Sequence, residues 1–254
     1  MKMQTLFASV FNEEMKARGY KKKGKLYYRL NGDILQGVII KTINPYTIHF
    51  YAAPYWTKNV QMEWSSITKG YWAEEGLEVS PGLDAYYREE NEELNLAYMN
   101  ACFEVAKTHI LPVLDEICDL DSYFEHLVPN WTLLNEEDRS KRFIKFDIKE
   151  IDNNFPQEDA EIKIYWDLWL DLDRHIPFVY YGCMHNDLNK GYELLKEIAS
   201  RMPATNDAAE FAKRKYAEFL MKNDLETAKK YFAERKEIML KRLSEEMKLD
   251  ISHL

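Results

Sequence analysis

The sequence lacks the features that most quickly define a protein class. Its three cysteines, Cys102, Cys118 and Cys183, show no CxxC spacing, which excludes a disulfide framework and a four-cysteine zinc site, so we expect buried thiols. No apolar run reaches the ~18 residues that a membrane span requires. The first residues begin an amphipathic pattern rather than the apolar core of a signal peptide. We therefore expect a cytoplasmic protein with no membrane partner.

Glycine and proline are also scarce, with nine and eight residues in a chain of 254. Together with the absence of low-complexity tracts, this scarcity excludes collagen-like and disordered architectures. Hydrophobic residues make up 46% of the chain and aromatic residues 14%. This apolar content is enough for one large core or two modest ones.

Motifs of known catalytic chemistry are missing as well. The six histidines form no HxxxH or HExxH pattern, so zinc-dependent hydrolysis is not predicted. No GxSxG sequence is present, and no cysteine has the surroundings of a nucleophile. The sequence points to no particular cofactor and leaves open whether the chain is an enzyme.

Charge is distributed unevenly within the net value of −9. Residues 1–50 hold nine Lys and Arg against three Asp and Glu, whereas residues 51–140 hold five against eighteen. An acidic chain is a poor general binder of nucleic acid, because neutralisation of phosphates by Lys and Arg dominates such affinity. Binding of nucleic acid is left open only for the basic N-terminal region.

Hydrophobic periodicity predicts an N-terminal helix that Gly19 ends, followed by an antiparallel meander with strands at 26–29, 34–43 and 46–52. The Asn31-Gly32-Asp33 sequence is typical of a hairpin turn. An irregular stretch to about residue 90 precedes a long helix over 91–117, which Pro112 should kink near residue 110. A short helix is expected around 122–127.

The later part of the chain gives a less uniform pattern. Residues 142–151 and 161–170 favour a second hairpin, although Trp166 and Trp169 also fit a helical stripe. Helices are expected from Pro177 onward. The predicted fold class is α+β, with an α+β domain over residues 1–172 and a helical, repeat-like domain over residues 173–254.

Two segments of the helical region echo each other at a spacing of 37 residues. Asp187 and Gly191 in the first correspond to Asp224 and Ala228 in the second. Each Asp is placed to cap a helix, and each small residue lets a neighbouring helix approach closely. The spacing is similar to the second helix of tetratricopeptide-like repeats. Two ordinary helical hairpins with the same caps explain the echo equally well.

The N-terminal sequence resembles a protein family that has no established activity. A helix ending in Gly19-Tyr20, the run 21–24, the aromatic strand 26–29 and a strand that bears Gln36 resemble a bacterial domain-of-unknown-function family whose number is four-three-zero-four. The likeness covers residues 1–55 and fades after the helix at 91–117. The resemblance implies a bacterial α+β domain and no catalytic residue.

The most concentrated charge lies in Lys21, Lys22, Lys23 and Lys25. A cluster of ammonium groups can bind phosphate or an acidic protein surface. The run lacks the spaced glycines and the Lys-Ser/Thr step of a Walker loop. The alternative is a solvated turn whose cations favour the C-terminal end of the first helix.

Three carboxylates, Asp167, Asp171 and Asp173, are close together in the sequence. In a strand these odd-numbered positions would share one face, where a hard cation such as Mg²⁺ could be bound. The alternative is an exposed polar face that leads into a helix capped by Asp173.

Aromatic side chains supply the remaining candidates for binding. Trp56, Tyr86 and Tyr87 lie among polar and acidic residues, so we expect them to be partly exposed and available to a ligand or partner. Most of the other aromatic residues should fill the core.

Two functions follow as hypotheses. The first is a cytoplasmic protein-interaction module, of the kind that acts as the antidote of a toxin, in which the acidic belt of residues 51–140 steers a basic partner. The alternative is a metal-assisted enzyme or binding protein for a phosphorylated ligand or a nucleic-acid end. In that case Lys21–Lys25 would hold the phosphate and the three carboxylates a metal ion.

Overall fold

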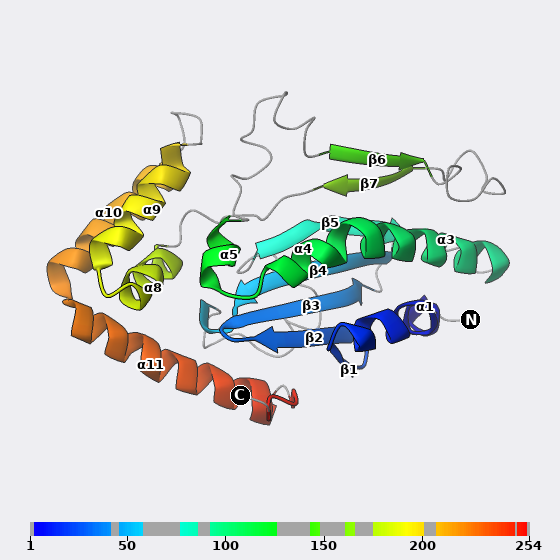
Figure 1. Ribbon diagram of the computed structural model, residues 1–254, viewed down its shortest axis with the longest axis horizontal. Helices are drawn as coiled ribbons and strands as arrows, with labels where there is room; N and C mark the ends of the chain where they lie inside the picture. Colours follow the sequence, from blue (N-terminus) through cyan, green and yellow to red (C-terminus); the bar gives the residue numbers. More distant parts are fainter. Residues whose placement is uncertain are drawn as a thin grey trace.

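The computed structural model describes residues 3–41, 46–57, 77–85, 92–125, 143–147, 161–165, 175–200, 207–246 and 248–252. Its main sheet has five antiparallel strands in the order β1 (Lys21–Lys23), β2 (Leu26–Asn31), β3 (Ile34–Lys41), β4 (Tyr46–Pro54) and β5 (Leu77–Ala85). A second hairpin, β6 (Phe143–Asp147) and β7 (Glu161–Tyr165), lies beside β5 (Figure 1). The predicted meander, second hairpin and α+β class are confirmed.

The N-terminal helix α1 (Met3–Ala17) ends as the sequence predicts, with Gly19 at a φ of 79°. Lys21–Lys23 are not the expected turn, because they pair with Leu26–Tyr28 as strand β1. Gly24, at a φ of 58°, begins the two-residue turn that makes this pairing possible. In the β2–β3 hairpin, Asn31 pairs with Ile34, which leaves Gly32 and Asp33 as the turn.

The predicted long helix is interrupted near Pro112, as expected. It consists of α3 (Glu92–Val105), the π-helical segment η3 (Ala106–Ile110) and α4 (Leu111–Glu116), in which Pro112 lies in the first turn. Proline has no N–H to donate there, and the wider π-helical turn takes up the mismatch. The short helix α5 (Leu120–Glu125) follows.

The helical region comprises α8 (Ile176–Met184), α9 (Leu188–Ser200), α10 (Asp207–Lys222), α11 (Leu225–Lys241) and the π-helical segment η6 (Arg242–Glu246). Asp224 caps α11 by accepting a hydrogen bond from the Thr227 N–H at 2.8 Å, as predicted. Gly191 lies so close to α8 that a Cβ atom there would overlap the carbonyl oxygen of Phe178. The small residue therefore does permit close helix packing.

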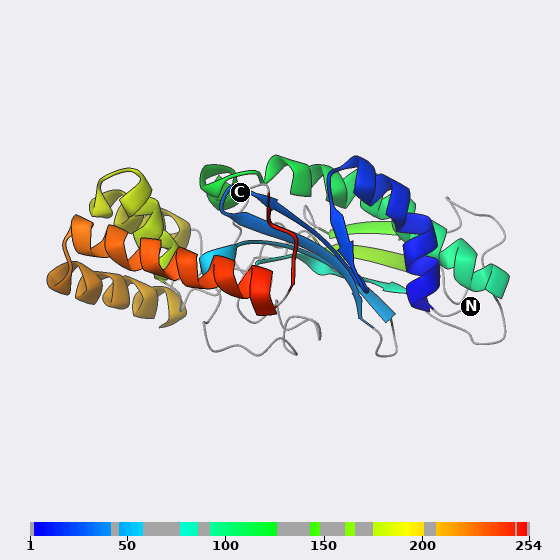
Figure 2. The same ribbon diagram turned by 90° about the horizontal axis from the view of Figure 1, so that it is seen from below.

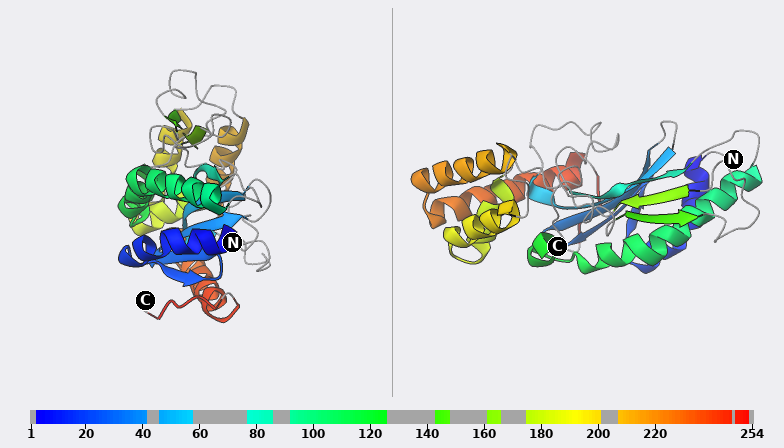
Figure 3. Two further views of the ribbon diagram at one scale, coloured as in Figure 1. Left: turned by 90° about the vertical axis from the view of Figure 1, so that its right-hand side faces the viewer. Right: turned by 90° about the horizontal axis from the view of Figure 1, so that it is seen from above.

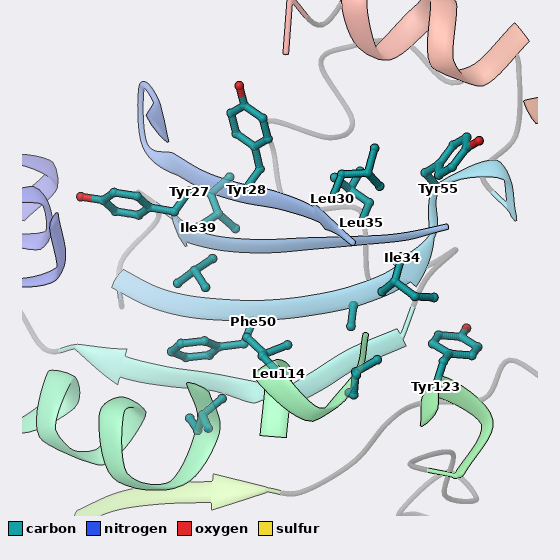
Figure 4. Close-up of a cluster of buried hydrophobic side chains, with 14 of the residues drawn as sticks. Tyr27, Tyr28, Leu30, Ile34, Leu35, Ile39, Phe50, Tyr55, Leu114 and Tyr123 are labelled. Carbon is teal, nitrogen blue, oxygen red and sulfur yellow. The ribbon is translucent and has the colours of Figure 1, made fainter. Parts of the chain in front are cut away.

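Helices cover both faces of the five-stranded sheet (Figures 1 and 2). On the face of α1, α3 and α4, the Phe7 ring packs against Tyr27 with centroids 5.5 Å apart. Figure 4 shows Tyr28, Leu30 and Leu35 pointing to the opposite side, toward α11. Helices α8, α9 and α10 gather at one end of the elongated molecule (Figure 3).

The predicted domain boundary at residues 172–173 lies outside the described residues. Buried side chains of the sheet region and of the helical region form one continuous hydrophobic core. The two regions therefore share their packing, chiefly where α8 and α11 meet the short 3-10 helix η1 (Tyr55–Thr57).

Gln36 joins three elements at the centre of the molecule. Its side chain is fully buried, and Nε2 donates to the carbonyl oxygens of Leu114 at 2.5 Å and Ile117 at 2.7 Å. Its Oε1 accepts from the Tyr20 hydroxyl at 2.9 Å and from Arg29 Nε at 2.8 Å. All four hydrogen-bonding positions of the amide are occupied. The hydrogen bonds therefore compensate for the desolvation of this buried polar group.

Arg29 extends this network to the end of α1. Its guanidinium donates to the backbone oxygen of Arg18 at 2.7 Å and forms an ion pair with Asp115 at 2.7 Å. Arg18 also forms an ion pair with Asp115. The network thus fixes α1 and α4 against β2 and β3.

We expect Gln36→Leu to lower the free energy of unfolding by about 2–4 kcal/mol, because two donors and two backbone acceptors lose their buried partner. Gln4→Leu, the same change at an exposed position of α1, is the matched control and should change it by less than about 0.5 kcal/mol. Urea unfolding of both variants measures the difference. Equal effects would contradict the assignment of the network.

We expect Gly191→Ala to lower the free energy of unfolding by about 3 kcal/mol and the thermal midpoint by about 6–12 °C, since α8 and α9 must separate to admit the methyl group. Lys190→Ala, an exposed neighbour in the same helix, should leave both values nearly unchanged. A thermal scan of the two variants is the measurement. A midpoint for Gly191→Ala that equals the control would show that the close approach is not required.

Candidate functional site

Three residues of the lysine cluster, Lys21–Lys23, form edge strand β1, where alternate side chains take opposite sides, and Lys25 lies in the turn that follows. Lys21 Nζ forms an ion pair with Asp250 Oδ2 at 2.7 Å, and Lys23 Nζ donates to the backbone oxygen of Lys248 at 3.1 Å. Lys22 lies over the Tyr27 ring, with Nζ 5.4 Å from its centroid. Burial lowers the pKa of Lys25. Lys21 and Lys23 therefore contact a segment of the same chain rather than forming an isolated solvated turn.

Several predicted site residues lie outside the described residues: Tyr86, Tyr87, Asp167, Asp171 and Asp173. The metal-assisted alternative requires the lysines and these carboxylates to lie close together. The described residues do not test this requirement, because they do not include the carboxylates. Within the described ranges, no group of three or more His, Cys, Asp or Glu side chains is placed to hold a metal ion.

The expectation that Trp56 is partly exposed is wrong. Its side chain is fully buried, with its ring 4.2 Å from that of Tyr180 and 5.3 Å from that of Phe232, measured between centroids. Its polar sequence neighbours gave no sign that α8 and α11, more than 100 residues later, cover it. Among the described residues its Nε1 has no hydrogen-bond partner, while its backbone oxygen accepts from Arg235.

A polar contact next to Trp56 joins the sheet region to the helical region. Asp33, in the β2–β3 turn, accepts hydrogen bonds from the Tyr180 hydroxyl at 2.5 Å and from Lys236 Nζ at 2.5 Å. The Lys236 ammonium also lies 4.6 Å from the centroid of the Tyr180 ring. Burial raises the pKa of Tyr180, and its hydrogen bond to Asp33 raises it further. We call this contact of Asp33 with Tyr180 and Lys236 the junction, because it connects the sheet region to the helical region.

Among the described residues, an open groove with a volume of about 700 Å³ lies along α8 and α9. Its lining includes Tyr181, His185 and Leu194, and the rings of Tyr181 and His185 lie 4.3 Å apart between centroids. Asn186 turns the chain between the two helices at a φ of 55°. The groove has an aromatic wall and charged edges.

Carboxylates from two separate segments surround this wall. His185 Nε2 lies 3.3 Å from Asp121 Oδ1 on α5, which brings one carboxylate of the acidic belt to the groove. Burial raises the pKa of Tyr181, and the negative charges of Asp121, Glu197 and Glu125 raise it further. Together with Asp121, the carboxylates of the lining outnumber its two lysines, so the groove carries a net negative charge.

The other lining residues of the groove are polar or charged: Asp187, Asn189, Lys190, Glu193, Lys196 and Glu197. The sequence had identified Asp187 only as a helix cap, and its carboxylate does accept from the Asn189 N–H at 3.0 Å. No local pattern predicts that α5 lies beside α8, because 64 residues separate Asp121 from His185. The groove is a product of tertiary packing.

The cysteines follow their expected placement only in part. Cys102 and Cys183 are buried thiols, as predicted, but Cys118 is exposed. Burial raises the pKa of Cys183 to about 11, which keeps this thiol protonated and unreactive near neutral pH.

Searches with models of protein families, among curated proteins and among solved structures found no match to the chain. The resemblances to the domain-of-unknown-function family and to tetratricopeptide-like repeats therefore stay predictions. No helix in the described ranges combines the length and the hydropathy that crossing a bilayer requires.

We expect Tyr180 to make the junction sensitive to alkali. Below pH 10 the hydroxyl is neutral in both states; above it, the unfolded chain ionises while the raised native pKa keeps the folded hydroxyl protonated, so stability falls. Between pH 8 and pH 11, the wild type should lose about 0.5–1 kcal/mol more than Tyr180→Phe. Urea unfolding at both pH values provides the measurement. An equal loss in the two proteins would contradict the assignment.

Proposed function

We propose that the chain is a protein-interaction module that binds a basic segment of its partner in the groove along α8 and α9. The observation that carries the proposal is that carboxylates of α5 and α9 lie at the aromatic wall, with Asp121 Oδ1 3.3 Å from His185 Nε2 and Glu197 in the lining of the groove. Such a surface complements lysine and arginine side chains, and its Tyr and His rings offer stacking faces to cations and to apolar groups.

The exposed apolar side chains of the described residues lie mostly in the helical region that contains the groove, although none of them lines it. Among the described residues, six large apolar side chains are exposed, and only Leu96 lies outside α8–α11; the other five are Met184, Phe211, Met221, Tyr231 and Ile238. Met221 is the most exposed of them, at 77%. Single exposed apolar residues are common on protein surfaces, so these residues do not by themselves define a partner surface.

The metal-assisted alternative has less support. Its lysine component is partly engaged within the chain, since Lys21 pairs with Asp250. The carboxylates that it requires lie outside the described residues. No observation of the described ranges favours a phosphorylated ligand over a peptide.

The proposal is tested by selection of binders from a library of random 12-residue peptides on the immobilised full chain. We expect the enriched peptides to be rich in Lys and Arg, because the groove is negative. Their affinity should fall as salt rises from 0.15 to 0.5 M, since exposed charges are screened.

Two double variants with the same charge change locate the binding surface. Glu193→Lys with Glu197→Lys, in the groove, should weaken the enriched peptides at least tenfold. Glu234→Lys with Glu237→Lys, both exposed on α11, is the matched control and should change affinity less than twofold. Enriched peptides without basic residues, or equal losses in the two variants, would overturn the proposal.

A further inference from the structure

A second surface of the molecule already carries a peptide segment, and that segment belongs to the chain itself. After α11 and η6, residues 248–252 lie against the β1–β2 hairpin, on the side of the sheet opposite α1. Figure 4 shows Tyr28 pointing to that side. The contacts of the segment define what this surface recognises.

Polar groups of the surface bind both the side chain and the backbone of the segment. Lys21 Nζ lies 2.7 Å from the Asp250 carboxylate and also donates to the Asp250 backbone oxygen at 3.0 Å. The Tyr28 hydroxyl accepts from the Asp250 N–H at 2.8 Å, and Lys23 donates to the Lys248 backbone oxygen at 3.1 Å. The hydrogen bond from Lys21 lowers the pKa of Asp250 well below its usual range, so the carboxylate is charged at neutral pH.

The segment also supplies an apolar anchor. Leu249 is only 3% exposed and belongs to the continuous core. Its N–H donates to the Leu243 backbone oxygen at 2.9 Å, which closes the end of η6. Lys248 takes a φ of 49°, a conformation that costs energy in any residue other than glycine. A buried leucine thus holds a strained turn and an exposed ion pair in place.

These contacts have the chemistry of polypeptide recognition rather than of phosphate recognition. A phosphate group can satisfy Lys21, but it offers no N–H to the Tyr28 hydroxyl and no apolar group for the Leu249 position. An exposed ion pair is weak and is screened by salt, so the segment is held mainly by Leu249. A segment held by so few contacts can exchange with a similar one.

We propose that the β1–β2 surface is a second binding site, for partner segments in which an apolar residue directly precedes an acidic one, and that Leu249–Asp250 occupies it until such a segment displaces them. This site is separate from the groove along α8 and α9 and recognises the opposite charge. It gives the predicted lysine cluster a function in binding acidic peptide.

The test uses the full chain and a fluorescent peptide with the sequence of residues 244–252. In the wild type the site is filled internally, whereas Leu249→Ser with Asp250→Lys frees it. We expect the peptide to bind this double variant at least tenfold more tightly than the wild type, measured by fluorescence anisotropy. Asp250→Asn removes the charge but keeps the shape of the exposed side chain. It should also increase the affinity for the peptide, by a smaller factor than the double variant does.

Further substitutions in the freed chain identify the contacts. Lys21→Glu should weaken the peptide at least tenfold, and a peptide with Asp250→Lys should restore binding to that variant. Lys22→Glu, the adjacent residue on the other side of β1, is the matched control and should retain the affinity within twofold.

The results that would overturn this second site differ from those that would overturn the groove along α8 and α9. Equal affinity for the wild type and the two variants of residues 249 and 250, or no binding to any of them, would overturn the second site. Displacement of the peptide by millimolar inorganic phosphate would also contradict peptide recognition. The groove variant Glu193→Lys with Glu197→Lys should bind this peptide as the wild type does.

Discussion

The side chain of Gln36 is the constraint on which the rest of the structure depends. A single buried amide satisfies two carbonyl oxygens at the end of α4 and two donors from the sheet and the end of α1. The amide can lie in a core strand because four hydrogen bonds compensate for its desolvation. The same four hydrogen bonds fix the positions of its partners. The network thereby sets the position of α1 and α4 on one face of the sheet and leaves the other face to α11.

The molecule uses its charges for both internal and external contacts. Asp33 joins Tyr180 and Lys236 at the junction of the two regions, where little solvent competes for the hydrogen bonds. The acidic groove and the basic β1–β2 surface are, in contrast, open to water. Charges in such places contribute little to stability and much to the choice of partner.

The sequence predicted most elements because their signals are local. The end of α1 at Gly19, the turn after Asn31 and the break near Pro112 each depend on the conformational limits of one or two residues. Burial of Trp56 could not be predicted, because the elements that cover it come from the far end of the chain. The groove was missed for the same reason, and the contact of Lys21 with Asp250 could not be predicted because 229 residues separate them.

In our proposal, the core around Gln36 carries a peptide segment that can leave it. Native-state hydrogen exchange of the full chain tests this claim directly by comparing the amides of Leu249 and Asp250 with those of strand β3. We expect the two amides to exchange through a local opening, well before the amides of the strand and faster as the salt concentration is raised. Exchange of the two amides only together with β3, through global unfolding, would contradict it.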